Sequence, residues 1–257
     1  MVGREVGNYY NRTYNECDET VLEVRGLTNK KVKNVSFSLK KGEILGFAGL
    51  VGAGRTETMR AIFGMDPVES GEILIDGKPV SIHSSKDAMA AGIGLVPESR
   101  REEGIFPAMT IKFNETVKVL NEFIHTFRVD HKKENEIADK YMHDLSVRAP
   151  GTFALVGNLS GGNQQKVVIA SWLATHPKIL IMDEPTRGID VGAKAEIYAI
   201  MNELAKNGVS IIMVSSELPE VIGMSDRVVV MRSGEISAVL DRTEADQVTI
   251  MKNAVNI

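Results

Sequence analysis

The feature that most constrains this chain is a glycine-rich turn that joins an apolar segment to a helix. Residues 43–48 form a strand pattern that is apolar on both faces, as expected in a buried parallel sheet, and run directly into the turn at residues 49–56. Helical spacing begins after Arg55. Strand and helix patterns alternate again between residues 179 and 232, which favours a sheet built from βα units. The sequence therefore predicts an α/β fold.

The turn itself reads Gly49-Leu50-Val51-Gly52-Ala53-Gly54-Arg55-Thr56. It matches the phosphate-binding pattern G-x-x-x-x-G-K-[ST] except at the lysine, where Arg55 stands. Glycines in such a turn let backbone N–H groups close around phosphate oxygens, and the Thr56 hydroxyl suits a magnesium ion. A plain tight turn is the alternative, because Arg55 departs at the strictest position. A dinucleotide-binding fingerprint is rejected, since Glu57 stands where its third glycine is required.

An acidic strand end supplies a second group. The predicted strand at residues 179–183 ends in the carboxylates of Asp183 and Glu184. Such a pair can place Asp183 beside magnesium and Glu184 beside an attacking water. Acidic residues that simply end a strand are the alternative interpretation.

A third segment, residues 159–166, reads Leu-Ser-Gly-Gly-Asn-Gln-Gln-Lys and precedes an apolar helix. Ser160 has the residue type of an ordinary helix N-cap. Gly161 and Gly162, however, have poor helix propensity and leave backbone N–H groups open to an anion. The segment therefore predicts a second anion-binding element.

These segments, in this order, resemble the motifs of the nucleotide-binding domains of ATP-binding cassette (ABC) transporters. More narrowly, residues 49–57, 159–166 and 183–194 resemble the second cassette of the tandem ATPases that drive bacterial ribose, galactose and xylose importers. The resemblance implies a P-loop NTPase core with a parallel sheet, an N-terminal antiparallel β subdomain, and an inserted helical subdomain at about residues 99–175. It also implies that residues 21–257 are one ABC ATPase domain and that residues 1–20 are a linker or tail from a preceding cassette.

The family's activity and partners follow from the same resemblance. It implies an ATP hydrolase that energises a monosaccharide importer, with ATP and Mg²⁺ as cofactors. The implied partners are a companion cassette in a head-to-tail dimer, permease subunits in the membrane and, indirectly, a sugar-binding protein, and no nucleic acid partner is expected. The implied location is peripheral, on the cytoplasmic face of the cell membrane. The positions that carry over are, for nucleotide, Gly49, Gly52, Ala53, Gly54, Arg55, Thr56, Glu57, Ser160, Gly161, Gly162 and Asp190; for metal, Thr56, Asp183 and Glu98; and for catalysis, Glu184, Ser216 and Glu98.

Several positions depart from the family's pattern around the phosphates. They are Arg55 for the lysine, Glu57 for a hydroxyl residue near the α-phosphate, Glu98 for the glutamine that senses the γ-phosphate, and Ser216 for the histidine that contacts it. No aromatic residue lies near residues 28–33, where the family stacks adenine. Losing one transition-state stabiliser costs about 10²–10³ in rate, so the resemblance predicts a nearly inert site here. The intact segment at residues 159–166 would instead complete the companion's site.

Two stretches differ in pattern from the rest. Residues 1–20 show neither helical nor strand periodicity and are predicted to form a tail or linker. Residues 99–155 show helical spacing and no convincing strand, which predicts an inserted helical lobe. Within it, the charged run at residues 100–103 is interpreted as a solvated loop, with contact to a membrane subunit as the alternative.

Composition excludes several other classes. Cys17 is the only cysteine, so an internal disulfide and a cysteine-based zinc cage are excluded. No apolar run approaches the roughly 20 residues of a membrane helix. A net charge of -4 gives no global attraction to nucleic acid. An ABC ATPase without a membrane partner, and a non-catalytic structural half, remain as alternatives.

Overall fold

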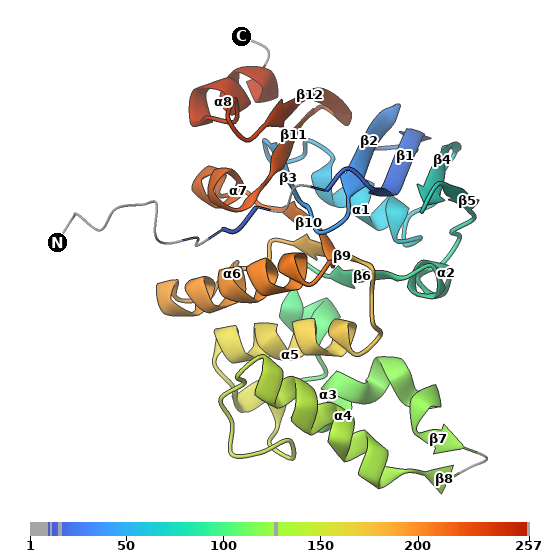
Figure 1. The fold of residues 1–257 in the computed structure, drawn as a ribbon, viewed down its shortest axis with the longest axis vertical. Coiled ribbons are helices and arrows are strands. Elements are labelled where there is room, and N and C mark those ends of the chain that lie inside the picture. Colours follow the sequence, from blue (N-terminus) through green and yellow to red (C-terminus); the bar gives the residue numbers. More distant parts are fainter. Residues whose placement is uncertain (1–9, 11, 15–16, 126–127, 256–257) are drawn as a thin grey trace, which may run out of the picture. The chain divides into compact units, whose positions relative to one another are not determined.

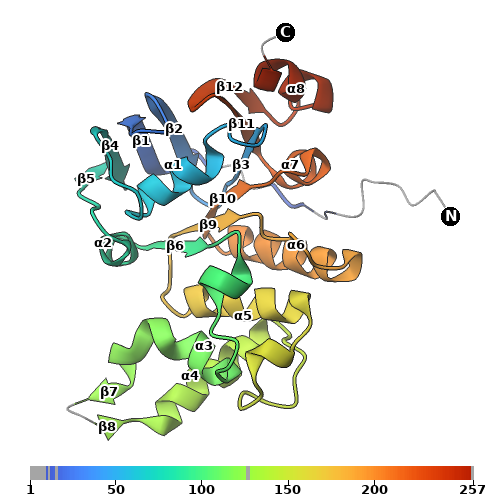
Figure 2. The same cartoon turned by 180° about the vertical axis from the view of Figure 1, so that it is seen from behind.

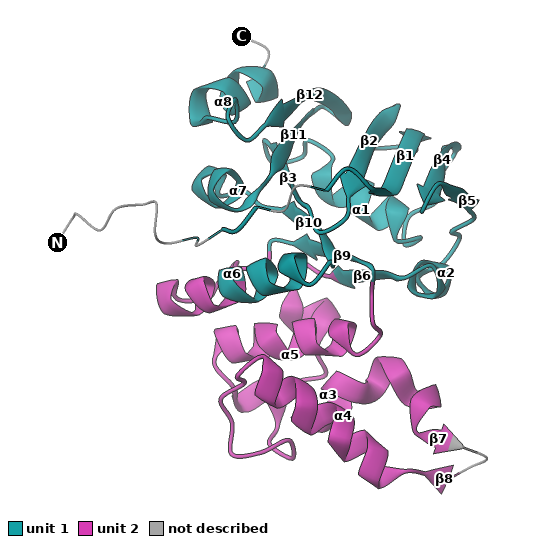
Figure 3. Ribbon diagram, in the orientation of Figure 1, with its two compact units in different colours: residues 1–95, 178–184, 198–257 teal, residues 96–177, 185–197 magenta. Residues whose placement is uncertain are grey.

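The computed structural model describes residues 10, 12–14, 17–125 and 128–255. The chain divides into two compact units, coloured in Figure 3. Unit 2 is inserted into the sequence of unit 1 at two places. Unit 1 comprises residues 1–95, 178–184 and 198–257, and unit 2 comprises residues 96–177 and 185–197.

A six-stranded sheet of order β12-β11-β3-β10-β9-β6 is the centre of unit 1 (Figure 1). Strands β9, β10, β3 and β11 run parallel, and β12 pairs antiparallel with β11. Every residue of β9 and β10 is buried, which explains their continuous apolar sequence. The strands are β3 (Ile44–Gly49), β6 (Ile93–Val96), β9 (Ile179–Asp183), β10 (Ser210–Val214), β11 (Arg227–Arg232) and β12 (Glu235–Asp241).

Strand β6 was missed by the sequence analysis. Its sequence, Ile-Gly-Leu-Val, has only four residues and lies between Gly92 and Pro97. A run this short has no readable period, and glycine and proline on either side indicate a loop. Its place at the sheet edge beside β9 depends on contacts distant in sequence.

A second, antiparallel sheet of order β2-β1-β4-β5 confirms the predicted β subdomain. Asp76 and Gly77 have φ of 50° and 72° and form the tight turn between two strands of this sheet. The rings of Phe37 and Phe47 lie 5.1 Å apart and join the cores of the two sheets. The strands are β1 (Thr20–Thr28), β2 (Val35–Lys40), β4 (Ser70–Ile75) and β5 (Lys78–Val80).

Each helix of unit 1 follows a strand, and all except α2 follow strands of the central sheet. Figure 2 brings α1, which follows β3, to the front of unit 1. Ser84 begins α2 by accepting a hydrogen bond from the Asp87 N–H at 3.3 Å. None of the described helices has the length and apolar character needed to cross a bilayer. The helices that lie wholly in unit 1 are α1 (Arg55–Ile62), α2 (Ser85–Ala90), α7 (Leu218–Met224) and α8 (Gln247–Val255). Helix α6 (Val191–Lys206) starts in unit 2 and belongs to unit 1 from residue 198 on.

The described part of the predicted tail has no helix or strand before Thr20, as expected, but it packs on unit 1. The rings of Tyr10 and Tyr198 lie 5.1 Å apart. The Arg12 guanidinium pairs with the Asp226 carboxylate, and the Arg12 side chain is only 1% exposed. These residues are therefore anchored by contacts that a search for periodicity does not detect.

Unit 2 is mainly helical, as predicted, with α3 and α4 packed together and α5 against both. Two parts of the prediction are wrong. Ile124–His125 and Arg128–Val129 form a small antiparallel pair, β7 and β8, too short to show a strand period. The charged run forms a turn of π-helix, Arg100–Gly104, rather than a loop, although Arg101, Glu102 and Glu103 are exposed to solvent as expected. The other elements are α3 (Ile111–Thr116), α4 (His131–Asp144), α5 (Gly161–Leu173) and the 3-10 turns Val117–Glu122 and Val156–Asn158.

Candidate nucleotide-binding site

The glycine-rich turn connects β3 to α1, and each glycine has a distinct physical role. A side chain at Gly49 would place its Cβ 2.5 Å from the carbonyl oxygen of Met231. Gly54 has a φ of 100° and precedes α1, whose first turn has no side-chain cap. Gly52 has a φ of 79°, and a Cβ there would meet open space. The turn thus leaves uncapped N–H groups and an open approach, which suits an anion.

Ala53 ties this turn to the rest of unit 1. Its N–H donates to the Leu50 carbonyl at 3.0 Å, and its own carbonyl accepts from the Gly234 N–H at 2.9 Å. The Ala53 side chain is buried. These bonds hold the loop shape before any ligand arrives.

Arg55, the departure from the phosphate-loop pattern, is 8% exposed. Its Nη1 donates to the backbone carbonyl of Ser215 at 2.7 Å, just beyond the end of β10. The Ser215 hydroxyl in turn donates to the buried carboxylate of Glu220. Because a guanidinium carries five N–H donors, the bond to Ser215 leaves others for an anion.

Asp183 lies at the end of β9 and is 3% exposed. Burial raises the pKa of Asp183 to about 6, although a hydrogen bond from Thr56 opposes this shift. Its Oδ1 is buried and has no hydrogen-bond partner among the described residues. An unpartnered carboxylate oxygen beside a threonine hydroxyl is a suitable donor set for Mg²⁺, so the residues fit this ion.

Glu184 and Ser216, the two residues of unit 1 that the sequence suggested for catalysis, form a hydrogen bond with each other. The Ser216 Oγ donates to Glu184 Oε2 at 3.1 Å. The Glu184 N–H donates to the Val214 carbonyl at 2.8 Å, and the residue has a φ of 48°. This left-handed backbone is rare outside glycine and is held here by contacts with β10.

Glu57 points toward a cation in unit 1. Its Oε1 lies 3.3 Å from the Nζ of Lys31. This pair offsets part of the repulsion that the carboxylate would exert on a phosphate. Since Lys31 is largely exposed, the offset is screened by solvent.

The remaining predicted residues belong to unit 2. Glu98 accepts a hydrogen bond from Nη1 of Arg187. Asp190 accepts from the Ala193 N–H at 3.0 Å through its Oδ1 and thereby caps α6. The predicted set is thus divided between the units: residues 49–57, 183, 184 and 216 in unit 1, and residues 98, 160–162 and 190 in unit 2.

Ser160 stands at the N-cap of α5 but does not cap it with its side chain. Its Oγ instead accepts a hydrogen bond from Nδ2 of Asn163 at 3.0 Å. The hydroxyl proton therefore remains able to donate, and the N–H groups of the first turn stay uncapped. Both properties favour an anion at this helix end.

The two glycines after Ser160 also lie close to neighbouring residues. A Cβ on Gly161 would lie 2.8 Å from Nη2 of Arg100, and one on Gly162 would lie 2.5 Å from the Cβ of Ala193. Sequence reasoning gave only one reason for these glycines, the exposure of N–H groups. The contact with Arg100 was missed because the charged run around it indicated a solvated loop.

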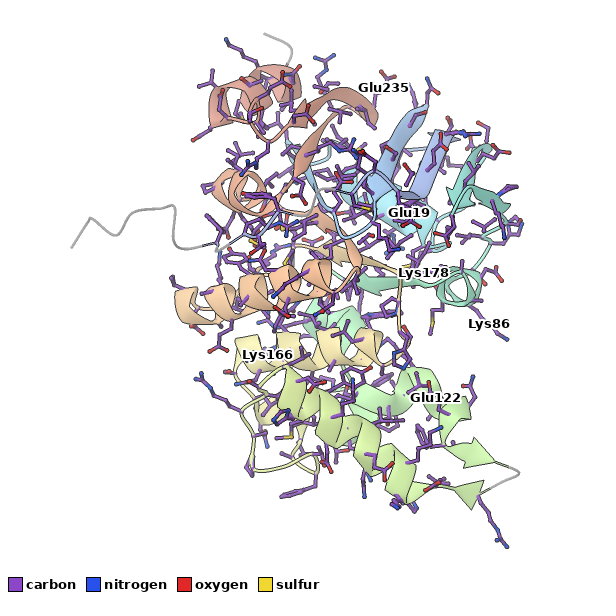
Figure 4. All side chains as sticks on the ribbon, viewed as in Figure 1. Glu19, Lys86, Glu122, Lys166, Lys178 and Glu235 are labelled. Carbon is purple, nitrogen blue, oxygen red and sulfur yellow. The ribbon has the colours of Figure 1, made fainter. Side chains whose placement is uncertain are left out.

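An ion pair anchors the other end of the segment. Lys166, labelled on α5 in Figure 4, is 3% exposed at its side chain. Its Nζ lies 2.8 Å from Oε2 of Glu196 and donates to the Ser146 carbonyl at 3.0 Å. Arg148 also pairs with Glu196, at 2.8 Å. The start of α5 is therefore held from several sides of unit 2.

A family model described as ABC transporter matches residues 32–187. The ribose import ATP-binding protein RbsA of Lactococcus lactis subsp. cremoris (strain SK11) is 50% identical over 254 residues, covering 99% of this chain and 52% of that protein. RbsA of Lacticaseibacillus paracasei (strain ATCC 334) is 50% identical over 252 residues, covering 98% and 50%. The chain thus spans about half the length of these curated relatives.

Solved structures give a similar result for the backbone. The ADP conformation of MJ1267, an ATP-binding cassette of an ABC transporter, matches with a TM-score of 0.78 and 22% identity, covering 92% of this chain and 97% of that one. The dimeric post-hydrolysis state of the cassette MJ0796, bound to ADP and Pi, matches with a TM-score of 0.73 and 19% identity, covering 86% and 98%. At these identities the likeness shows a shared fold.

Proposed function

Because this chain belongs to the family of ABC transporter ATP-binding domains, we propose that it is one of two cassettes that bind and hydrolyse ATP to drive a bacterial monosaccharide importer. The buried Oδ1 of Asp183, without a partner among the described residues, is the observation that carries the ATP and Mg²⁺ part of the proposal. The similarity to ribose import ATP-binding proteins supports the choice of substrate class.

The proposed organisation keeps the boundaries expected from the sequence. Residues 21–257 act as one ABC ATPase domain with a helical subdomain at about residues 99–175, and residues 1–20 are a linker from a preceding cassette. The proposed partners are that companion cassette, permease subunits and, through them, a sugar-binding protein, with no nucleic acid involved. The domain would work at the cytoplasmic face of the cell membrane.

Each residue of the turn and strand ends has a proposed task. The glycine-rich turn, including Gly49, Gly52, Ala53 and Gly54, cradles phosphate oxygens with backbone N–H groups, and Arg55 adds positive charge beside them. Thr56 and Asp183 hold Mg²⁺. When bound, the ion supplies charge neutralisation at the phosphates. Glu184 orients the attacking water and accepts its proton, and Ser216 holds that carboxylate.

We propose that this cassette's own site is slow. Ser216 is a neutral donor and its hydroxyl is directed to Glu184, so it brings no positive charge to a γ-phosphate. Glu57 keeps a carboxylate near the turn, and its Lys31 partner is largely exposed. Ser160 with the N–H groups of Gly161 and Gly162 would instead grip the nucleotide bound by the companion cassette, with Asp190 in the adjoining loop.

The test compares two substitutions in the two-cassette protein reconstituted with its permease. Ser160→Arg fills the space of the companion's phosphate and should lower steady-state ATPase at least 100-fold. Glu184→Gln changes only this cassette's slow site. It should lower the steady-state ATPase rate less than about threefold, since most turnover occurs at the companion site. Thermal unfolding of both variants provides the control for folding. Equal loss in the two variants would overturn the asymmetric assignment.

A further inference from the structure

Arg100 joins two backbone segments of unit 2 that the sequence treated as separate. Its Nη1 donates to the carbonyl of Arg187 at 2.7 Å, and its Nη2 donates to the carbonyl of Gly188 at 3.1 Å. Arg187 in turn donates to the Glu98 carboxylate. The guanidinium thus holds two consecutive carbonyls of the loop that leads to Asp190.

The N-terminus of α5 packs directly on this contact. A Cβ at Gly161 would lie 2.8 Å from Arg100 Nη2, 3.3 Å from the Gly188 carbonyl oxygen and 3.3 Å from Cγ2 of Ile189. Gly161 is therefore in close contact with both Arg100 and the loop that it holds. The next residue of α5, Gly162, is equally close to Ala193 in the first turn of α6.

We propose that Arg100 is a positioning residue that fixes the Arg187–Asp190 loop against the first turn of α5, so that Ser160 and Asp190 reach the companion's nucleotide together. The inference rests on the proposed function, because it specifies how that trans-acting surface is kept in shape. Arg100 touches neither the nucleotide nor the reacting atoms in this assignment and acts only through the loop and the helix.

Arginine is specific for this task because its planar fork reaches two carbonyl oxygens at once, whereas a lysine ammonium on a flexible stem holds a single point. Arg101, the next residue, is exposed and has no hydrogen bond in the described part of the chain, which makes it a matched control.

The first measurement uses hydrogen exchange in this 257-residue chain, with Arg100→Lys, Arg100→Gln and Arg101→Gln. Both Arg100 variants should speed exchange about tenfold in peptides covering residues 161–164 and 187–193, because opening of these segments becomes local and easier. The Arg101 variant should match the wild type. Unchanged exchange in both Arg100 variants would overturn the proposal, whatever the activity of the protein.

The second measurement is steady-state ATPase of the two-cassette protein with its permease. The Arg100 variants should lower kcat about 10- to 100-fold with KM for ATP changed less than twofold, since displaced groups cost turnover more than ground-state binding. A kcat within twofold of the Arg101→Gln variant would refute the positioning role while the proposed function stands. A wild-type protein without permease-dependent ATPase would instead refute the proposed function, and the exchange result would still decide the role of Arg100.

Discussion

At the residue scale, the candidate site contains one carboxylate suited to a cation and two residues that depart from the common phosphate-loop pattern. Asp183 must be a carboxylate if it is to bind a cation, because its buried Oδ1 has no partner among the described residues. Arg55 and Glu57 depart from the common phosphate-loop pattern, yet each has a partner in unit 1, the Ser215 carbonyl and Lys31 respectively. These partners are the reason that we expect ATP to bind here even if hydrolysis at this site is slow, as proposed.

Asp183→Asn tests the cation site directly. The substitution keeps shape and removes the charge, so ATP should bind to this chain with the same affinity in Mg²⁺ and in EDTA. The wild-type chain should bind ATP at least tenfold more tightly with Mg²⁺ than without it, about 1.4 kcal/mol. Titration calorimetry in the two buffers measures both differences, and Asp190→Asn, in the other unit, is the matched control. A Mg²⁺ dependence that survives in Asp183→Asn would place the cation elsewhere.

At the element scale, unit 2 keeps an uncharged acid inside its helices. Glu115 on α3 is 0% exposed, and neither of its carboxylate oxygens has a hydrogen-bond partner among the described residues. Burial raises the pKa of Glu115 to about 8, and the charge of Asp139 adds to the shift. The residue is therefore protonated in the folded chain at neutral pH. Its cost to stability grows as the pH rises above about 4.5, because the unfolded chain then releases this proton while the folded chain still holds it.

The stability of the chain should depend on this group between about pH 4.5 and pH 8. The folded chain keeps the Glu115 proton over that window and the unfolded chain releases it, so the free energy of unfolding falls as the pH rises. Glu115→Gln should remove this part of the slope and stabilise the chain at pH 8 by about 1–3 kcal/mol. Urea unfolding at pH 5 and pH 8 measures the change. Equal slopes in the variant and the wild type would contradict the burial of a protonated acid.

The described residues of the N-terminal tail also pack at a specific place on unit 1. A Cβ on Gly223, in α7, would lie only 2.2 Å from Cδ2 of the Tyr10 ring. Asn202 also donates to the Tyr10 carbonyl, at 2.7 Å. The ring of Tyr10 therefore fits against unit 1 only because residue 223 has no side chain.

Gly223→Ala should expel Tyr10 and expose Arg12, whose side chain is now 1% exposed. Trypsin should then cleave after Arg12 at least tenfold faster than in the wild type, because cleavage follows the population of the open form. Tyr10→Ala provides a second variant that leaves α7 unchanged and should behave alike. Resistance of both variants to cleavage at Arg12 would mean that the tail is held by other contacts.

At the scale of the whole molecule, the candidate nucleotide-binding residues are divided between two compact units. Unit 1 holds the glycine-rich turn, the acidic strand end and Ser216, and unit 2 holds the uncapped start of α5. If the second set serves a companion cassette, this chain alone lacks part of its own catalytic surface. Its activity in isolation should then be low even where binding is measurable.

The isolated chain should turn over ATP far below the roughly 10 s⁻¹ of a median enzyme. We expect a rate at least 100-fold lower, because the proposed slow site has Ser216 and Arg55 at its phosphate-contacting positions and the assay contains no companion cassette. A coupled assay for released phosphate, with Glu184→Gln as the blank, measures the residual rate. Turnover near 10 s⁻¹ would show that the site is efficient and that its departures from the family's pattern do not slow hydrolysis.

The sequence by itself determined the elements whose cause is local. The apolar run of β3 and the glycines before α1 each follow from neighbouring residues, and the structure confirms them. The same holds for the acidic end of β9. A continuous apolar run and a group of glycines are both encoded within a few positions, so pattern and spacing were sufficient.

Only the tertiary structure decided which polar groups are partnered and which are left free. Arg100 looked like a solvated charge, but its fork holds carbonyls 87 and 88 residues away in sequence. Ser160 looked like a cap, but Asn163 takes its oxygen, and Arg12 is buried on an aspartate 214 residues away. The physical reason is that a hydrogen bond or ion pair depends on the distance between its partners in space, which residue type and sequence spacing do not specify.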